Sequence, residues 1–511
     1  MLKRILLLIT IFTLFPMLSL AEGDIEKGKE VYGKRCSWCH GKDGAGDGPA
    51  SEFLNPAPRD FTLGVYKWKS TPFDEIAPSD EDFNRMIAGA NAHNGIPGWT
   101  GMNGTSMPGW ADMLSGSEIK NATAYIKSLG GLEKPEKGKI DLSSKVRSSK
   151  ESIESGGKLF RDRCSECHGE EGRGDGTKKL KDDWGGRTWP RNLTKGWSFR
   201  VTNEPEDIYA RITVGIPGTQ MPSFADPQSK KIMTDKERWD VANYVASLDE
   251  PYKKPGDSDA IKAVRVTGQL PKDAKSEAWA KAEYTSFYMV PQIIANERHF
   301  KPSLNSISVK VLYNESEIVF LLEWDDPTKS MPWDEKAIEI ADGELFVDGV
   351  AVQFPVVSKE SEKPYFGMGD SKPVNIWFWQ SEGAIDSPQS LKLMNSKGAS
   401  NSEIRMSEEI GLKATGAYEK GTWRVILTRP LKTGDSKRDI QFEPGKFIPV
   451  AFAAWDGSNG DKGSRHVMTS WHWLILETEA DNSFYVWPVL IGLFVFAGEL
   501  LWLYSARRKK D

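Results

Sequence analysis

Two copies of the pattern Cys-x-x-Cys-His constrain this chain more than any other feature. The first is Cys-Ser-Trp-Cys-His at residues 36–40, and the second is Cys-Ser-Glu-Cys-His at residues 164–168. The chain has four cysteines, and the two motifs use all of them. Two thiols three residues apart on a helical turn can form thioethers to the vinyl groups of a haem, while the adjacent histidine reaches the iron. The motifs therefore predict two covalent c-type haems.

The residues around each motif form an internal repeat whose parts come in the same order. The shared parts are a Gly-x-x-Gly-x-Gly-Asp-Gly loop, a Pro-Arg pair and a Met-Pro pair, at residues 41–48, 58–59 and 107–108 in the first copy and 169–176, 190–191 and 221–222 in the second. A helical pattern opens and closes each copy. Residues 22–132 and 150–250 are thus predicted to be two all-α domains with one fold.

The repeat also predicts the ligands of each haem. Cys36 and Cys39 would hold the first haem with His40 on its iron, and the second copy would use the equivalent set, Cys164, Cys167 and His168. The sixth ligand must come from far along the chain, and Met107 and Met221 suit it because a thioether stabilises ferrous iron. Alternatives are Met86, His93, Met102 and Met113 in the first copy and Met233 in the second.

Other uses of these motifs fit less well. The two cysteine pairs lie too far apart for one zinc site, and a thioredoxin-like pair lacks its βαβ context. With its helix, haem motif, methionine loop and closing helix, each copy resembles class I cytochrome c. Arg59 and Arg191 are candidates to pair with haem propionates, although either could equally be a solvated surface residue.

The residue pattern of the chain changes after the second copy. Residues 249–257 are polar and proline-rich, which predicts a linker over 251–278. β-branched and aromatic runs then recur between residues 306 and 476, separated by Gly, Asn, Asp and Pro turns. This pattern predicts an all-β domain, an antiparallel sandwich, over residues 279–481.

Three stretches of this domain, at residues 346–355, 366–379 and 453–460, resemble the haem-b domain of ethylbenzene dehydrogenase γ subunits. In that family a methionine and usually a lysine hold a non-covalent haem b. The resemblance implies Met368 as the methionine, and His466 stands where the lysine is expected, with Lys462 as the alternative. Met331 and His472 are weaker candidates that more simply pack in the sandwich.

The two ends of the chain suggest where it works. A basic start, an apolar run and Ser-Leu-Ala at residues 19–21 predict a signal peptide over 1–21. Residues 484–504 are almost continuously apolar and precede Arg-Arg-Lys-Lys at 507–510, which predicts a C-terminal transmembrane helix with a short cytoplasmic tail. Most of the chain would then be periplasmic or otherwise extracytoplasmic.

Together these features predict a membrane-anchored electron-transfer protein with two haems c and one haem b. The net charge of -5 gives no reason to expect nucleic acid, and no molybdopterin or iron-sulfur motif is present. The resemblance implies partners: the molybdenum and iron-sulfur subunits of an oxidoreductase such as nitrite oxidoreductase or an oxyanion reductase, and a soluble cytochrome or terminal oxidase. The chain itself is then a non-catalytic subunit. Alternatives are a ligand-binding or sensory sandwich joined to cytochromes, and a haem peroxidase.

Overall fold

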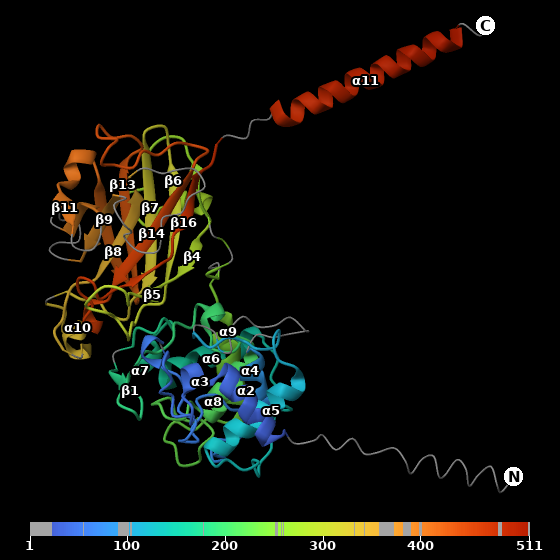
Figure 1. Ribbon diagram of the computed structural model, residues 1–511, viewed down its shortest axis with the longest axis vertical. Coiled ribbons are helices and arrows are strands. Elements are labelled where there is room, and N and C mark those ends of the chain that lie inside the picture. The colour runs from blue at the N-terminus through green and yellow to red at the C-terminus, as the bar shows by residue number, and fades with distance from the viewer. Residues whose placement is uncertain are drawn as a thin grey trace.

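A computed structural model describes residues 23–54, 56–89, 102, 105–176, 178–250, 254–256, 258, 260–331, 333–341, 343–356, 373–381, 390–397, 401–478 and 483–508. The predicted signal peptide lies outside these residues. The described chain forms a helical N-terminal region and a large β domain packed on top of it (Figure 1).

The first repeat is a small helical domain. Its elements are α2 (Ile25–Arg35), α3 (Ser37–His40), η1 (Ser51–Phe53), α4 (Asp80–Ala88) and α5 (Gly116–Leu129). Side-chain caps fix where these helices begin: Asp24 accepts from the first turn of α2, and Ser79 and Ser115 form capping boxes at α4 and α5. Tyr32, Phe61, Phe83 and Ile126 are in its core.

The second repeat follows the same plan. Its elements are α6 (Lys150–Arg163), α7 (Ser165–His168), β1 (Leu180–Lys181), β2 (Arg187–Thr188), η2 (Gly196–Ser198), α8 (Pro205–Val214) and α9 (Asp235–Ser247). The β1 and β2 pair is a departure from the predicted all-α fold. It has only two residues a strand, too few for the alternation by which a strand is detected in a sequence.

In both repeats the first and last helices cross at a glycine. A Cβ on Gly28 would lie 2.0 Å from the carbonyl oxygen of Asn121, and one on Gly156 would lie 2.0 Å from that of Asp240. Only glycine allows such a close approach of two backbones. The glycine that the two copies share before their haem motifs is therefore there for helix packing, and it fixes where each motif begins.

The β domain is built from fourteen described strands. In chain order they are β3 (Ala260–Arg265), β4 (Thr285–Tyr288), β5 (Val290–Pro291), β6 (Ser306–Tyr313), β7 (Glu317–Asp325), β8 (Gly349–Pro355), β9 (Val374–Gln380), β10 (Leu391–Ser396), β11 (Ser402–Arg405), β12 (Lys413–Glu419), β13 (Thr422–Pro430), β14 (Phe447–Trp455), β15 (Val467–Met468) and β16 (His472–Leu476). Short helices η3 (Glu277–Lys281), α10 (Glu335–Ile340), η5 (Ser407–Ile410) and η6 (Gly457–Asn459) connect some of them.

These strands form one sheet in the order β11-β10-β9-β8-β14-β16-β3-β6-β7-β13-β12. Strand β14 joins its two halves, because residues 447–450 pair with β16 and residues 451–455 pair with β8. The halves enclose a core rich in aromatic side chains, which includes Trp324, Trp377, Trp379 and Trp423. Residues 457–461 follow β14 and lie at the end of the sheet nearest the helical region (Figure 1).

Two predictions about this domain are wrong in part. Strand β3 lies inside the stretch predicted as a linker, and it pairs in parallel with β16 and β6, so the sheet is mixed and not purely antiparallel. Residues 260–265 alternate between buried and exposed positions over only six residues, next to a polar and proline-rich stretch. Because the alternation is short and its neighbours are typical of a linker, the sequence did not indicate a strand here.

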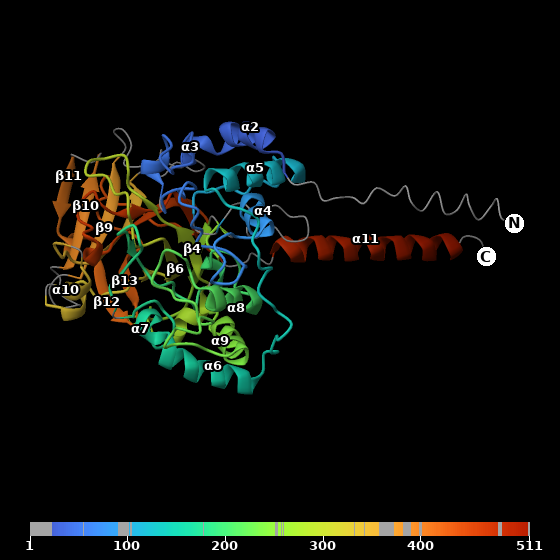
Figure 2. The ribbon, with the colours of Figure 1, turned by 90° about the horizontal axis from the view of Figure 1, so that it is seen from below.

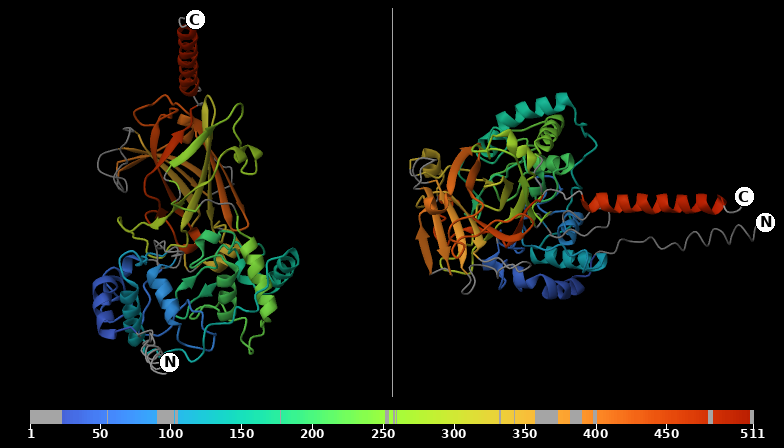
Figure 3. Two further views of the ribbon diagram at one scale, coloured as in Figure 1. Left: turned by 90° about the vertical axis from the view of Figure 1, so that its right-hand side faces the viewer. Right: turned by 90° about the horizontal axis from the view of Figure 1, so that it is seen from above.

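The two helical domains lie side by side, and the β domain rests on both (Figures 2 and 3). Helix α11 (Ser483–Arg508) projects from the far end of the β domain (Figure 1). Its side chains are described for residues 487–503. Within the described part of the chain, no helix is long and apolar enough to cross a membrane, so the span predicted for residues 484–504 has no support here.

Candidate haem-binding site

Each motif histidine is held by the Pro-Arg segment of its own repeat. The Nδ1 atom of His40 lies 2.9 Å from the carbonyl oxygen of Arg59, and that of His168 lies 3.4 Å from the carbonyl oxygen of Arg191. A proton on Nδ1 can therefore be donated to the backbone, which leaves Nε2 free for a metal. Burial lowers the pKa of both imidazoles, so both are neutral and can ligate.

The glycine-rich loop brings the Pro-Arg segment back to the histidine. The Gly46 N–H donates to the carbonyl of His40, and the Gly174 N–H donates to that of His168. Three glycines at equivalent positions of each loop have φ between 74° and 83°, a conformation that glycine adopts without strain. They are Gly41, Gly44 and Gly46 in the first loop and Gly169, Gly172 and Gly174 in the second. The shared glycines thus encode one loop geometry in both domains.

The four cysteines are free thiols, with no disulfide between them. Burial raises the pKa of Cys36 and of Cys164 to about 12. Two neutral thiols beside a neutral histidine suit thioether formation with a haem.

One cavity of about 940 Å³ contains both candidate sites, and the two cysteines and the histidine of each motif line it. Met107 and Met221 line it as well, so the structure brings each predicted sixth ligand to the same cavity as its motif. Met86 and Met102 also line the cavity, whereas Met113 is exposed and Met233 is buried in the core. His93 lies outside the described residues.

A threonine two residues before each methionine has a role that was not predicted from the sequence. The Met107 N–H donates to the Thr105 hydroxyl oxygen at 3.4 Å, and the Met221 N–H donates to that of Thr219 at 3.2 Å. Each hydroxyl in turn donates to a carbonyl three residues before the threonine. The repeated Thr-x-Met-Pro sequence is the signal that could have shown this turn.

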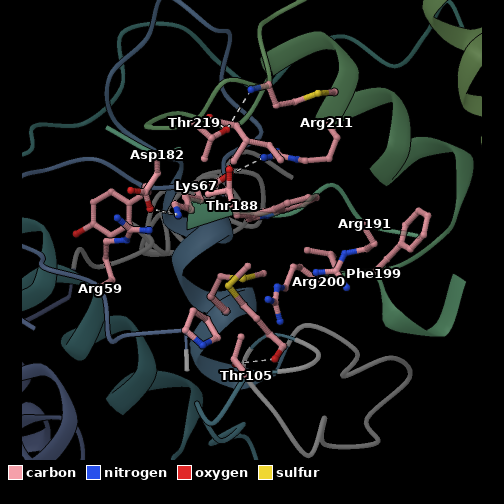
Figure 4. Close-up of a pocket in the computed structure, with 18 of the residues that line it drawn as sticks. Arg59, Lys67, Thr105, Asp182, Thr188, Arg191, Phe199, Arg200, Arg211 and Thr219 are labelled. Carbon is pink, nitrogen blue, oxygen red and sulfur yellow. Dashed lines mark hydrogen bonds and ion pairs between the residues drawn. The ribbon is translucent and has the colours of Figure 1, made fainter. Parts of the chain in front are cut away.

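Six arginines line the cavity, and burial matters most for four of them: Arg59, Arg191, Arg200 and Arg211. Burial lowers the pKa of each of them, that of Arg191 to about 9 with a further contribution from Arg200, and those of Arg200 and Arg211 to about 10. Arg191 and Arg200 lie on one side of the hollow and Arg59 on the other (Figure 4). Buried guanidinium groups are the complement that the carboxylates of haem propionates require, so the cavity fits two haems.

The two helical domains meet beside this cavity. The Arg211 guanidinium lies 4.1 Å from the ring centroid of Trp68, and its two NH groups donate to the carbonyls of Lys67 and Lys69. Arg85 forms a paired contact with Asp207, at 2.9 and 2.8 Å. The domains are thus joined by buried charged contacts at the wall of the site.

The ligands expected in the β domain are only partly described. Met368 lies outside the described residues. His466 is half-buried, with its Nδ1 3.1 Å from the Gly463 carbonyl oxygen and its ring 4.7 Å from that of Trp455. The Nζ of Lys462 lies 4.3 Å from the Phe346 ring centroid.

The two weaker candidates in this domain have packing roles. Met331 is buried, and the ring of His472 stacks on Phe287 at 3.9 Å. Ligation of a haem b by Met368 and by His466 or Lys462 stays a prediction.

Two family models match the chain. The model described as Cytochrome c matches residues 25–130 and again 153–249. The model described as Ethylbenzene dehydrogenase matches residues 276–402 and 397–467. The boundaries agree with the two helical domains and the β domain.

The relatives are γ or haem subunits of oxidoreductases. The chlorate reductase subunit gamma of Ideonella dechloratans is 26% identical over 42% of this chain and 82% of its own length. The dimethylsulfide dehydrogenase subunit gamma of Rhodovulum sulfidophilum is 28% identical over 40% and 74%. A putative respiratory nitrate reductase heme subunit of Haloferax mediterranei is 24% identical over 43% and 73%.

A solved chain of the Kuenenia stuttgartiensis reducing HAO-like protein complex is 36% identical, with 45% of this chain and 99% of that chain covered and a TM-score of 0.39. The domains of the chain follow from the two family models, and its kinship follows from the γ-subunit relatives. The chain consists of two cytochrome c domains and an ethylbenzene dehydrogenase γ-like domain, and its homologues are γ subunits of the dimethyl sulfoxide reductase family.

Proposed function

We propose that this chain is the electron-transferring haem subunit of a molybdoenzyme complex of the nitrate, chlorate, nitrite or dimethylsulfide type. Its two haems c would exchange electrons with a soluble cytochrome or an oxidase, and a haem b in the β domain would exchange them with an iron-sulfur subunit. The observation that carries the proposal is the single cavity shared by both Cys-x-x-Cys-His motifs.

A haem supplies reversible one-electron exchange when it is bound, and the chain's own residues favour that use over catalysis. His40 and His168 are fixed by their Nδ1 contacts, and Met107 and Met221 can close the opposite sides. If each imidazole and its methionine thioether bound the haem iron together, no ligand position would remain for peroxide or another substrate. Because both sites line one hollow, electrons can pass between them without crossing a protein layer.

The contact between the β domain and the second cytochrome domain supports a longer path. Lys195 Nζ lies 2.9 Å from the Asp325 carboxylate, and Lys336 Nζ donates to the carbonyl of Asp175, in the loop after the second haem motif. Trp197 also meets Tyr288 across this contact, with ring centroids 6.2 Å apart. These contacts place the loop after the second haem motif against the β domain and support the second haem c as one step of the path.

We also propose that the chain works outside the cytoplasm and that α11 holds it at a membrane. Haem attachment through Cys-x-x-Cys-His and the leader-like start support the first part. The exposed apolar side chains of α11, among them Phe494 and Leu501, support the second. Removal of residues 483–511 should release the protein from a washed membrane fraction, and retention of the shortened chain on the membrane would refute this attachment.

The experiment for the main proposal is a stopped-flow reaction of the full chain with its molybdenum and iron-sulfur partner. Oxidised protein is mixed with partner that its own substrate has reduced, and the haem b and haem c absorption bands are followed separately. The proposal expects haem b to be reduced first and haem c afterwards. Reduction of haem c at an unchanged rate in a protein that contains no haem b would overturn the proposed path.

A further inference from the structure

Three aspartates meet inside the β domain, away from the haem cavity. Asp326 follows β7, Asp348 precedes β8 and Asp456 follows β14. All three side chains have no solvent exposure, and one carboxylate oxygen from each lies within 4.8 Å of the other two. Asp456 is more than a hundred residues from the other two in the sequence, yet the fold places all three acidic groups around one point.

Hydrogen bonds satisfy two of these carboxylates and leave the third incomplete. Asp348 accepts from the N–H groups of Ser330 and Gly457 and from the Trp423 indole. Asp456 accepts hydrogen bonds from the Ser303 hydroxyl, from the N–H and the hydroxyl of Ser458, and from the Asn459 N–H.

Asp326 is different, because only its Oδ1 accepts, from the N–H and the hydroxyl of Thr328. Its Oδ2 is buried and has no hydrogen-bond partner among the described residues. A buried carboxylate oxygen without a partner is costly, so this atom points to a ligand that is still to be accounted for.

The negative charges of the three aspartates also favour a bound cation. The three carboxylate oxygens lie within 4.8 Å of one another, and none of the three side chains is exposed to solvent that could screen them. In the described part of the chain, none of the three forms an ion pair with lysine or arginine. The Arg187 guanidinium donates to the carbonyl of Ser458, two residues after Asp456. A bound cation would supply the missing positive charge.

We propose that Asp326, Asp348 and Asp456 bind a calcium ion. All three side chains offer oxygen, which excludes the soft metals that need sulfur and favours hard cations. Magnesium usually keeps several of its waters, whereas calcium accepts protein oxygens in irregular arrangements at about 2.3–2.6 Å. The Thr328 and Ser330 hydroxyls, 3.0 Å apart, lie next to the carboxylates and can complete the ligand set.

The site lies where the β domain meets the second cytochrome domain. The Asp326 N–H donates to the Gly421 carbonyl at 2.8 Å, and a Cβ on Gly421 would lie 2.7 Å from the Cβ of Asp175 in the loop after the second haem motif. Calcium at this point would fix the turns after β7 and β14, and with them the surface on which that loop rests. The ion would thus have a structural role, independent of the proposed electron-transfer partner.

The test measures bound calcium and thermal stability in the full-length haem-loaded protein. The protein is stripped with a calcium chelator, returned to excess CaCl2 and desalted, and its calcium is counted by mass spectrometry. Unfolding of the β domain is then followed by tryptophan fluorescence with calcium or with chelator. We expect one calcium per chain and an unfolding temperature several degrees higher with the ion.

Asp326→Asn keeps the shape of the side chain and removes the charge, so it should abolish both the bound calcium and the shift. Glu315→Gln, which changes an exposed carboxylate between β6 and β7, should change neither. If Asp326 is a protonated acid and not a ligand, wild-type protein binds no calcium and Asp326→Asn unfolds at the same temperature or higher. Calcium retained by Asp326→Asn would likewise overturn the proposal, and the wild-type measurement decides even if this variant fails to fold.

Discussion

The guanidinium of Arg211, in the second cytochrome domain, lies 4.1 Å from the ring centroid of Trp68, in the first. Both residues line the shared cavity, so a contact between the two domains is also part of the wall of the haem site. The same contact therefore joins the two domains and forms part of the wall of the site.

Replacing Arg211 by methionine should loosen this contact. The variant loses the interaction with Trp68 and the hydrogen bonds to the Lys67 and Lys69 carbonyls, while the methionine fills part of the space. The free energy of unfolding should fall by about 1–3 kcal/mol, after allowance for the cost of burying the charge. Denaturant unfolding of the haem-loaded protein measures this, and the exposed Arg147→Met is the control. Equal stability of the two variants would contradict this role.

The contact between the β domain and the second cytochrome domain offers a matched pair of lysines. Lys195 is buried and pairs with Asp325, whereas Lys420 is exposed and pairs with Glu171 at the same contact. Lys195→Met should cost about 1–3 kcal/mol because it leaves a half-buried carboxylate unpaired, and Lys420→Met should stay within about 0.5 kcal/mol. Adding Asp325→Asn to the Lys195 variant should restore part of the loss. If both lysines behave alike in denaturant unfolding, burial is not what gives this pair its strength.

The methionine ligands can be tested one domain at a time. Met107→Ala and Met221→Ala should each remove half of the sulfur-to-iron absorption band and lower one haem potential by on the order of 0.1 V, since loss of the thioether destabilises ferrous iron. Met113→Ala and Met233→Leu, which change methionines outside the cavity lining, should leave both quantities unchanged. Redox titration with absorption detection measures them. A full band in either alanine variant would assign the sixth ligand to another residue, such as Met86 or Met102.

The two motif histidines predict how the cytochrome domains respond to acid. Burial holds the pKa of His40 and of His168 below the value of about 6.5 expected in the unfolded chain. Below that pH the unfolded state binds more protons than the folded state, so stability falls with pH by about 1.4 kcal/mol per pH unit for each histidine, and it is complete above about pH 6.5. The prediction applies to haem-free protein, in which no iron occupies Nε2, and far-UV circular dichroism follows it because the cytochrome domains hold most of the helices packed in the described core. Constant stability down to about pH 5 would contradict neutral, buried histidines.

The sequence alone predicts those parts of the protein that local chemistry fixes. Cys36, Cys39 and His40 are adjacent, their equivalents recur, and both sets lie where the repeat predicts them. The contact between Trp68 and Arg211 is different, because nothing near either residue indicates a partner more than a hundred positions away. Strand β3 was missed for a related reason: its place between β16 and β6 depends on strands that lie far along the chain.

The haem count tests the central account most directly. The purified full-length protein is extracted with acidified acetone, which removes non-covalent haem and leaves thioether-bound haem on the chain, and both fractions are measured as pyridine haemochromes. We predict two haems c on the chain for each haem b in the extract, and loss of the haem b in a Met368→Ala variant. Haem c alone would contradict a relay that continues into the β domain.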